Sequence, residues 1–212
     1  MSFAAPAKYG RKFVRPPSAL GDGLRIGLLG GSFNPAHSGH RHISALALKT
    51  LRLDYVWWLV SPQNPLKSTQ GMAPFDARFA AAQAFAQHPR IVVTDIEGVF
   101  GMTYTADTLA ALRTRFPRLR FVWLMGTDNL VQFPRWRRWR QILCLTPVAV
   151  AARPGTALTA RTAKTALYLR GHIALADARF ASRRPPGLTL MDAKRDFTSA
   201  TRLRSSALSP GS

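Results

Sequence analysis

The chain has 212 residues, 47% of them hydrophobic, so it is long enough to bury the core of one large domain. This composition excludes a disordered chain, a collagen and a small disulfide scaffold, and no apolar run reaches the roughly 18 residues of a membrane-spanning helix. The formal net charge of +20 favours anionic partners, whether nucleic acid, acidic lipid or phosphorylated metabolites.

The beginning of the chain differs in composition from the rest. Residues 1–23 combine four basic residues with prolines and small residues, and Asp22 is their only acid. We expect them to form a flexible basic arm, followed by a single domain over residues 24–212. Cys144 is the only cysteine, so no internal disulfide forms, which fits a reducing, cytoplasmic location.

Alternating strand and helix patterns begin at Arg25. Residues 26–29 predict a buried strand that ends at Gly30 and Gly31, and the residues after Gly39 have helical spacing. The later patterns predict strands at 55–60, 91–94, 121–125, 148–152 and 188–191, helices at 76–85, 105–116 and 162–169, and a loop at 183–187. This alternation indicates an α/β fold in which helices cover both faces of a parallel sheet.

The turn after the first strand carries the clearest chemical pattern. Residues 30–40 contain three glycines and two histidines but no carboxylate. Glycines let backbone N–H groups approach an anion, the following helix start adds partial positive charge, and His37 and His40 share one face of its first turn. The pattern indicates a phosphate site. The alternatives are a capped strand-to-helix turn and a zinc site formed by His37, His40 and His42.

Residues 31–40 resemble the G-x-F-x-P-x-H-x-G-H signature of the nucleotidylyltransferase superfamily. Within it, residues 61–67, 103–109, 125–128, 134–136 and 152–155 are similar to bacterial nicotinate mononucleotide adenylyltransferases. Residues 199–204 resemble the family motif I-S-S-T-x-x-R, although Thr198 and Ala200 depart from it. The resemblance implies a Rossmann-like, doubly wound parallel sheet. It also implies an enzyme of NAD biosynthesis that transfers AMP from ATP to nicotinate mononucleotide.

The resemblance also implies roles for individual residues. The catalytic residues would be His37, His40, Lys67 and Arg204. ATP would be bound by both histidines and by Gly30, Gly31, Ser32, Phe33, Gly126, Asp128, Ser199, Thr201 and Arg204. Nicotinate mononucleotide would be bound by Asn34, Thr103, Tyr104, Thr105, Trp136 and Arg137. Simpler alternatives remain, with Asp128 or Thr105 as a helix N-cap, and residues 134–140 as a basic helix that buries one tryptophan.

The acidic residues are scattered, so we expect no protein-built metal cluster and expect Mg²⁺ to arrive bound to ATP. The expected partners are ATP and nicotinate mononucleotide, with no membrane contact. Nicotinamide mononucleotide, or another phosphorylated acceptor such as phosphopantetheine, is the alternative substrate. Nucleic-acid binding would explain the charge but not the two histidines of the turn. The sequence does not indicate which oligomeric state the protein has.

Overall fold

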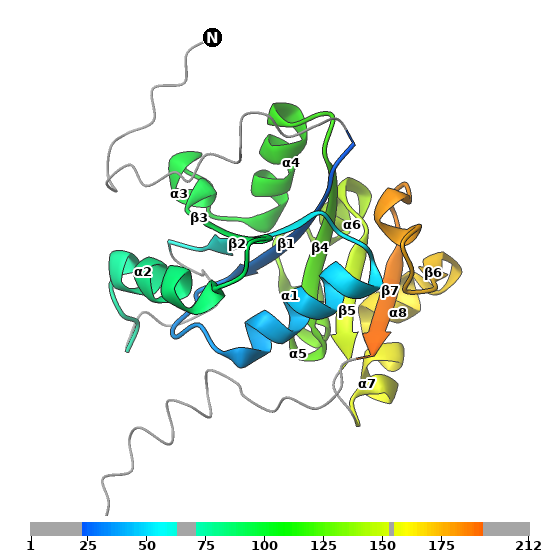
Figure 1. Cartoon of the computed structure of the whole chain (residues 1–212). Coiled ribbons are helices and arrows are strands. Elements are labelled where there is room, and N and C mark those ends of the chain that lie inside the picture. Colours follow the sequence, from blue (N-terminus) through cyan, green and yellow to red (C-terminus); the bar gives the residue numbers. More distant parts are fainter. Residues whose placement is uncertain (1–22, 63–70, 153–154, 193–212) are drawn as a thin grey trace, which may run out of the picture.

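The computed structural model describes residues 23–62, 71–152 and 155–192 (Figure 1). Their strands form one seven-stranded parallel sheet in the order β3-β2-β1-β4-β5-β7-β6. The chain builds the sheet outward in one direction from β1 to β3 and in the other direction from β4 onward. The predicted doubly wound, Rossmann-like parallel sheet is therefore confirmed. The strands are β1 Arg25–Gly31, β2 Tyr55–Val60, β3 Ile91–Thr94, β4 Arg120–Gly126, β5 Val148–Ala152, β6 Ile173–Ala174 and β7 Leu188–Asp192.

Helices cover both faces of this sheet (Figure 1). Side chains alternate along each strand, so Leu28 packs on the face covered by α4 and α6, and Leu29 on the face covered by α1 and α2. The α-helices are α1 Ser38–Thr50, α2 Phe75–Ala86, α3 Ile96–Val99, α4 Thr105–Arg115, α5 Thr127–Gln132, α6 Trp139–Leu145, α7 Ala157–Thr162 and α8 Lys164–Tyr168. The 3₁₀ turns are η1 Phe133–Arg135, η2 Arg170–His172 and η3 Phe180–Ser182. In the described part of the chain, no helix has the length and apolarity to cross a membrane.

The structure departs from the sequence prediction mainly in short elements. Of the predicted helix at 162–169, residues 164–168 form α8. Thr162 is the last residue of another short helix, α7, which the sequence did not predict, and Ala163 between the two has a non-helical backbone (φ −59°, ψ 141°). Helix α3 has four residues and strand β6 has two, too few to show a period in the sequence. Residues 1–22 of the predicted arm lie outside the described residues.

Gly30 has a packing role in the centre of the sheet. A Cβ atom at this position would lie 2.6 Å from Cη2 of Trp123, whose side chain is fully buried on the neighbouring strand β4. The indole therefore occupies the space that a side chain at position 30 would need. Trp123 also packs edge-on against Trp136 with ring centroids 6.1 Å apart, which links the centre of the sheet to the segment after η1.

We predict that Gly30→Ala destabilises the protein by about 1–3 kcal/mol, because the added methyl group overlaps the Trp123 ring. Urea denaturation would measure the loss. Gly171→Ala is the matched control, since a Cβ at that exposed position would meet no atom of the described residues within 4 Å. Equal stability of the two variants would contradict this reading of the packing.

Candidate active site

The site lies where the direction of sheet building reverses, between the neighbouring strands β1 and β4. Gly31 ends β1 and Gly126 ends β4, so the residues that follow both strands meet at the carboxyl edge of the sheet. In open parallel sheets, the crevice at this reversal is where ligands bind. The structure thus brings the predicted phosphate turn and the Gly126–Asp128 segment to the same edge.

Two histidines define the start of α1. His37 is the N-cap residue, and its Nδ1 accepts the backbone N–H of Gly39 at 3.1 Å. His40 reaches back, and its Nδ1 accepts the backbone N–H of His37 at 3.2 Å. The imidazole centroids are 4.0 Å apart, so both rings lie on one side of the turn, as their spacing in the sequence predicts. The two hydrogen bonds form a capping box, a pair of reciprocal side-chain contacts at a helix start that is usually made by Ser or Thr at the N-cap and Glu or Gln three residues later.

These hydrogen bonds determine which nitrogen of each imidazole carries the proton. A nitrogen that accepts a backbone N–H carries no proton, so in each neutral imidazole the proton is on Nε2. Each ring therefore presents an N–H donor at its Nε2 end. Two adjacent Nε2–H donors at a helix N-terminus suit the oxygens of a phosphate.

Phe33 supports the turn from beneath. Its side chain is buried, with its ring stacked 5.1 Å from Trp58 and 4.5 Å from the His40 ring. Its φ of 47° lies in the left-handed region, which is uncommon for a residue with a side chain and often marks functional turns. Ser44 and Trp58 extend this support, because Trp58 Nε1 donates to Ser44 Oγ, which donates to the His40 carbonyl oxygen, both at 2.8 Å.

Asp128 lies in the first turn of α5 and is exposed. The N-cap of α5 is Gly126, so the alternative in which Asp128 is a helix cap is wrong. Among the described residues, a Cβ atom on Gly126 would meet only Cδ1 of Ile43, at 4.0 Å. The predicted role of Asp128 toward the adenosine ribose stays a prediction.

The segments predicted to bind the acceptor nucleotide lie against each other. The Arg137 guanidinium carbon is 4.7 Å above the Tyr104 ring, and Arg138 forms an ion pair with Asp107. Trp136 is partly buried and packs edge-on against Phe133 at 5.1 Å. Residues 103–107 and 136–138 are thus adjacent, and we call them the two walls of the predicted acceptor site.

Two of the simpler alternatives for these walls fail. The N-cap of α4 is Tyr104 without a side-chain hydrogen bond, so Thr105 is its first helical residue. Residues 134–140 do not form one basic helix, because η1 ends at Arg135 and α6 begins at Trp139. Arg138 between them has φ 54°, in the left-handed region. Trp139 is buried, as that alternative expected, whereas Trp136 is only partly covered.

Several predicted site residues have other surroundings or lie outside the description. The Asn34 side chain donates to the Gly71 carbonyl at 3.1 Å and accepts the Ala73 N–H at 3.3 Å, so these contacts tie the turn to the start of α2. Lys67, Ser199, Thr201 and Arg204 lie outside the described residues. Among the described residues, no three His, Cys, Asp or Glu side chains form a possible metal site, which leaves the zinc alternative without support.

Two buried ionisable residues that the sequence patterns do not single out lie next to these segments. Arg78 on α2 is 3% exposed, and Glu97 on α3 is 5% exposed. Both contact Ser61, which directly follows β2: Arg78 donates to its carbonyl oxygen, and Glu97 bonds to its side chain. Neither residue stands out in the sequence, because an arginine in an amphipathic helix or an acid after a short strand is usually solvated.

Burial raises the pKa of Glu97 to about 7, although hydrogen bonds from Ser61 and Thr108 oppose the rise. The Thr108 hydroxyl lies 3.3 Å from Oε1. The Glu97 carbonyl oxygen accepts the N–H of Met102. Glu97 is therefore bonded to the residue that directly precedes the segment 103–105. Desolvation raises the pKa of nearby Asp95 as well.

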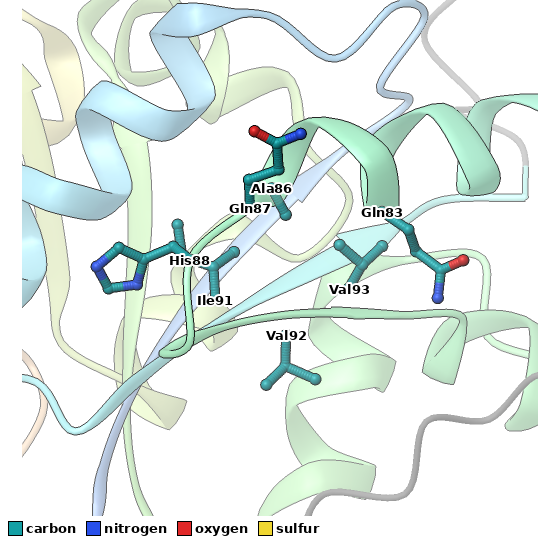
Figure 2. A pocket seen from close by; sticks show the side chains of 7 residues that line it. All are labelled: Gln83, Ala86, Gln87, His88, Ile91, Val92 and Val93. Carbon is teal, nitrogen blue, oxygen red and sulfur yellow. The ribbon is translucent and has the colours of Figure 1, made fainter.

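A separate hollow of about 310 Å³ lies at the amino end of β3, beside the last turn of α2 (Figure 2). It is lined by Gln83, Ala86, Gln87, His88, Ile91, Val92 and Val93. The phosphate turn is at the other, carboxyl edge of the sheet. None of the lining residues belongs to the predicted site.

Comparison with known proteins agrees with this geometry. The family model described as cytidylyltransferase-like matches residues 28–206, which defines the class of the fold and the site. A "Probable nicotinate-nucleotide adenylyltransferase" of Parvibaculum lavamentivorans is 54% identical over 189 residues, which are 87% of this chain and 93% of the relative. A protein of the same name from Cereibacter sphaeroides is 53% identical over 180 residues, 84% of this chain and 96% of the relative.

The chain belongs to the nicotinate-nucleotide adenylyltransferase family. A solved structure of the Plasmodium falciparum nicotinic acid mononucleotide adenylyltransferase, complexed with NaAD, has the same fold. Its TM-score is 0.63 at 16% sequence identity, and the match covers 86% of this chain and 83% of that one.

The raised pKa of Glu97 predicts that the stability of the protein depends on pH. Its pKa is 4.5 without burial and about 7 in the folded protein, so between these values the folded state binds more protons than the unfolded state. The free energy of unfolding should therefore fall by about 3 kcal/mol as the pH rises through this window, and stay level above it. Urea denaturation at several pH values would measure this.

Glu97→Gln is the matched variant, because the neutral amide keeps the shape of the side chain without the titration. In this variant the free energy of unfolding should fall much less over the same pH window, and the remaining fall should come from Asp95, whose pKa is also raised. An equally steep fall in Glu97→Gln would show that another group titrates.

Proposed function

We propose that the chain transfers the AMP portion of ATP to nicotinate mononucleotide, giving nicotinate adenine dinucleotide and pyrophosphate. The observation that carries this proposal is the pair of imidazoles with Nε2–H donors at the start of α1, beside the ends of β1 and β4. The family membership and the printed names of the relatives support the same reaction and acceptor.

The reaction needs no covalent enzyme intermediate. A phosphate oxygen of the mononucleotide attacks the α-phosphorus of ATP, a new P–O bond forms, and the bond to the β-phosphate bridging oxygen breaks to release pyrophosphate. The nucleophile is already ionised, so no general base is required. Catalysis then consists of positioning the two phosphates and stabilising the charge on the oxygens of the α-phosphoryl group.

His37 and His40 supply this stabilisation in our proposal. Their Nε2–H groups donate to the ATP phosphate oxygens, while their Nδ1 atoms stay bonded to the backbone and hold the rings in place. Gly30, Gly31, Ser32 and Phe33 provide backbone N–H groups near the phosphates, and Gly126 and Asp128 contact the adenosine. Lys67, Arg204, Ser199 and Thr201 add further phosphate contacts, as the family motifs imply.

The acceptor binds against the two walls formed by residues 103–107 and 136–138. The Trp136 indole stacks on the pyridine ring, and the backbone N–H of Arg137 donates to the nicotinate carboxylate. Thr103, Tyr104, Thr105 and Asn34 complete the pocket. The contact between Arg137 and Tyr104 and the ion pair between Arg138 and Asp107 support this arrangement, because they hold the two walls together.

We propose that the divalent metal of the reaction is Mg²⁺ and that it enters as part of the MgATP substrate, bound by phosphate oxygens and water. The scattered acids of the described residues fit a metal that the nucleotide carries. A cytoplasmic location is part of the same proposal, supported by the single, exposed and unbridged Cys144.

The proposed reaction predicts a ranking of acceptors. With ATP and Mg²⁺, pyrophosphate release should be fastest with nicotinate mononucleotide, slower with nicotinamide mononucleotide and absent with phosphopantetheine or no acceptor. Chromatography should identify nicotinate adenine dinucleotide as the product. Folded protein that binds ATP but releases no pyrophosphate with any of the three acceptors would refute the proposed reaction.

The histidine pair predicts a separation of stability from turnover. His37→Asn and His40→Gln keep a side-chain acceptor for the backbone N–H groups, but their amide N–H groups do not lie where the imidazole ring holds its Nε2–H. Turnover should fall about 100-fold in each, while the urea midpoint stays near that of the wild type. His37→Ala and His40→Ala should also lose turnover, and in addition lose the cap, at a cost of about 1 kcal/mol. Near-normal rates in the folded variants would refute the role of the turn.

A further inference from the structure

Arg78 is a buried cation whose described hydrogen bonds all end on backbone carbonyl oxygens. Its Nε donates to Ala73 at 2.9 Å, its Nη1 to Ser32 and Ser61, and its Nη2 to Pro62 at 3.0 Å. Burying an arginine is costly unless its N–H groups are satisfied, and these four bonds satisfy most of the five. The carbonyl oxygens favour the protonated form, although burial lowers the pKa of Arg78.

The four carbonyl oxygens belong to three segments around the phosphate turn. Ser32 lies in the turn itself, Ser61 and Pro62 directly follow β2, and Ala73 directly precedes α2. The Asn34 side chain makes a second link between the turn and Ala73. Arg78 is thus the point where the turn, the end of β2 and the start of α2 are joined.

The bond to Ser32 also sets the direction of one peptide group. In a trans peptide the carbonyl C=O and the following N–H point to opposite sides. Because the Ser32 oxygen accepts a hydrogen bond from the buried Arg78 guanidinium, the N–H of Phe33 points away from that guanidinium. The φ of Phe33 is 47°, and a left-handed conformation is unfavourable for a residue with a side chain, so contacts from the surrounding structure must hold it.

We propose that Arg78 is a positioning residue for ATP. By holding the Ser32 carbonyl oxygen, it keeps the Phe33 N–H directed at a bound phosphate group, and by binding Ser61 and Pro62 it fixes the distance between this turn and the end of β2. The guanidinium acts through the backbone and does not touch the nucleotide. This inference rests on the proposed function for the identity of the ligand.

Arg78→Lys tests the proposal, because lysine keeps the charge but not the planar set of donors that reaches three segments. Calorimetry with Mg²⁺ and α,β-methylene-ATP should show about tenfold weaker binding than in the wild type, whereas binding of nicotinate mononucleotide should change less than about twofold. In turnover assays, kcat/KM for ATP should fall while KM for the mononucleotide stays level.

Arg90→Lys is the matched control. Arg90 also donates to a backbone carbonyl oxygen, that of Leu53 at 3.4 Å, but it precedes β3 at the amino edge of the sheet. It should bind both ligands as the wild type does. Lower thermal stability of Arg78→Lys with wild-type affinity for α,β-methylene-ATP would show a purely structural role and overturn the inference.

Two further outcomes are distinguishable. If Arg78→Lys does not fold, NMR of the wild type decides, because the amide resonance of Phe33 should shift on addition of Mg²⁺ and α,β-methylene-ATP. An unshifted Phe33 amide in a saturated complex would overturn the inference and leave the proposed reaction intact. Wild-type protein that binds no α,β-methylene-ATP would overturn both.

Discussion

The active site depends on how the backbone N–H groups at the start of α1 are satisfied. The first N–H groups of a helix have no partner within the helix, and here the Nδ1 atoms of His37 and His40 accept two of those at this end. These two hydrogen bonds therefore begin the helix, fix the proton of both imidazoles on Nε2 and set the rings side by side. A Ser or Asp cap would begin the helix equally well but would supply no N–H donors for phosphate.

The surrounding structure holds this turn from two directions. Below it, Phe33, Trp58 and Ser44 pack against or bond to His40, and Arg78 binds the carbonyl oxygen of Ser32. Beside it, Gly30 has no side chain, so the Trp123 ring packs directly against its backbone. Trp123 also packs against Trp136. Ser61 contacts both buried ionisable residues, Arg78 and Glu97, so the supports of the turn and of the acceptor wall meet at the end of β2.

The sequence was sufficient for the main strands and for the phosphate turn, because long apolar runs and a dense glycine and histidine pattern are local signals. The strands at 55–60, 91–94 and 148–152 have the predicted bounds. Local patterns cannot report contacts between distant residues. The carbonyl oxygens that bind Arg78 belong to residues 5 to 46 positions away, and the hydrogen-bond partners of the buried Glu97 are Ser61 and Thr108. Helix α7 was not predicted because its six residues are too few to show a helical period.

The tautomer of the two histidines is the most direct test of this account. Nitrogen-15 NMR of the imidazoles, assigned with His37→Asn and His40→Gln, distinguishes a protonated Nε2 from a protonated Nδ1. The account predicts Nε2–H for both neutral rings, and a shift of both Nε2–H signals when MgATP is added. A proton on Nδ1 of either ring would contradict it, because that nitrogen could not accept the backbone N–H on which the turn depends.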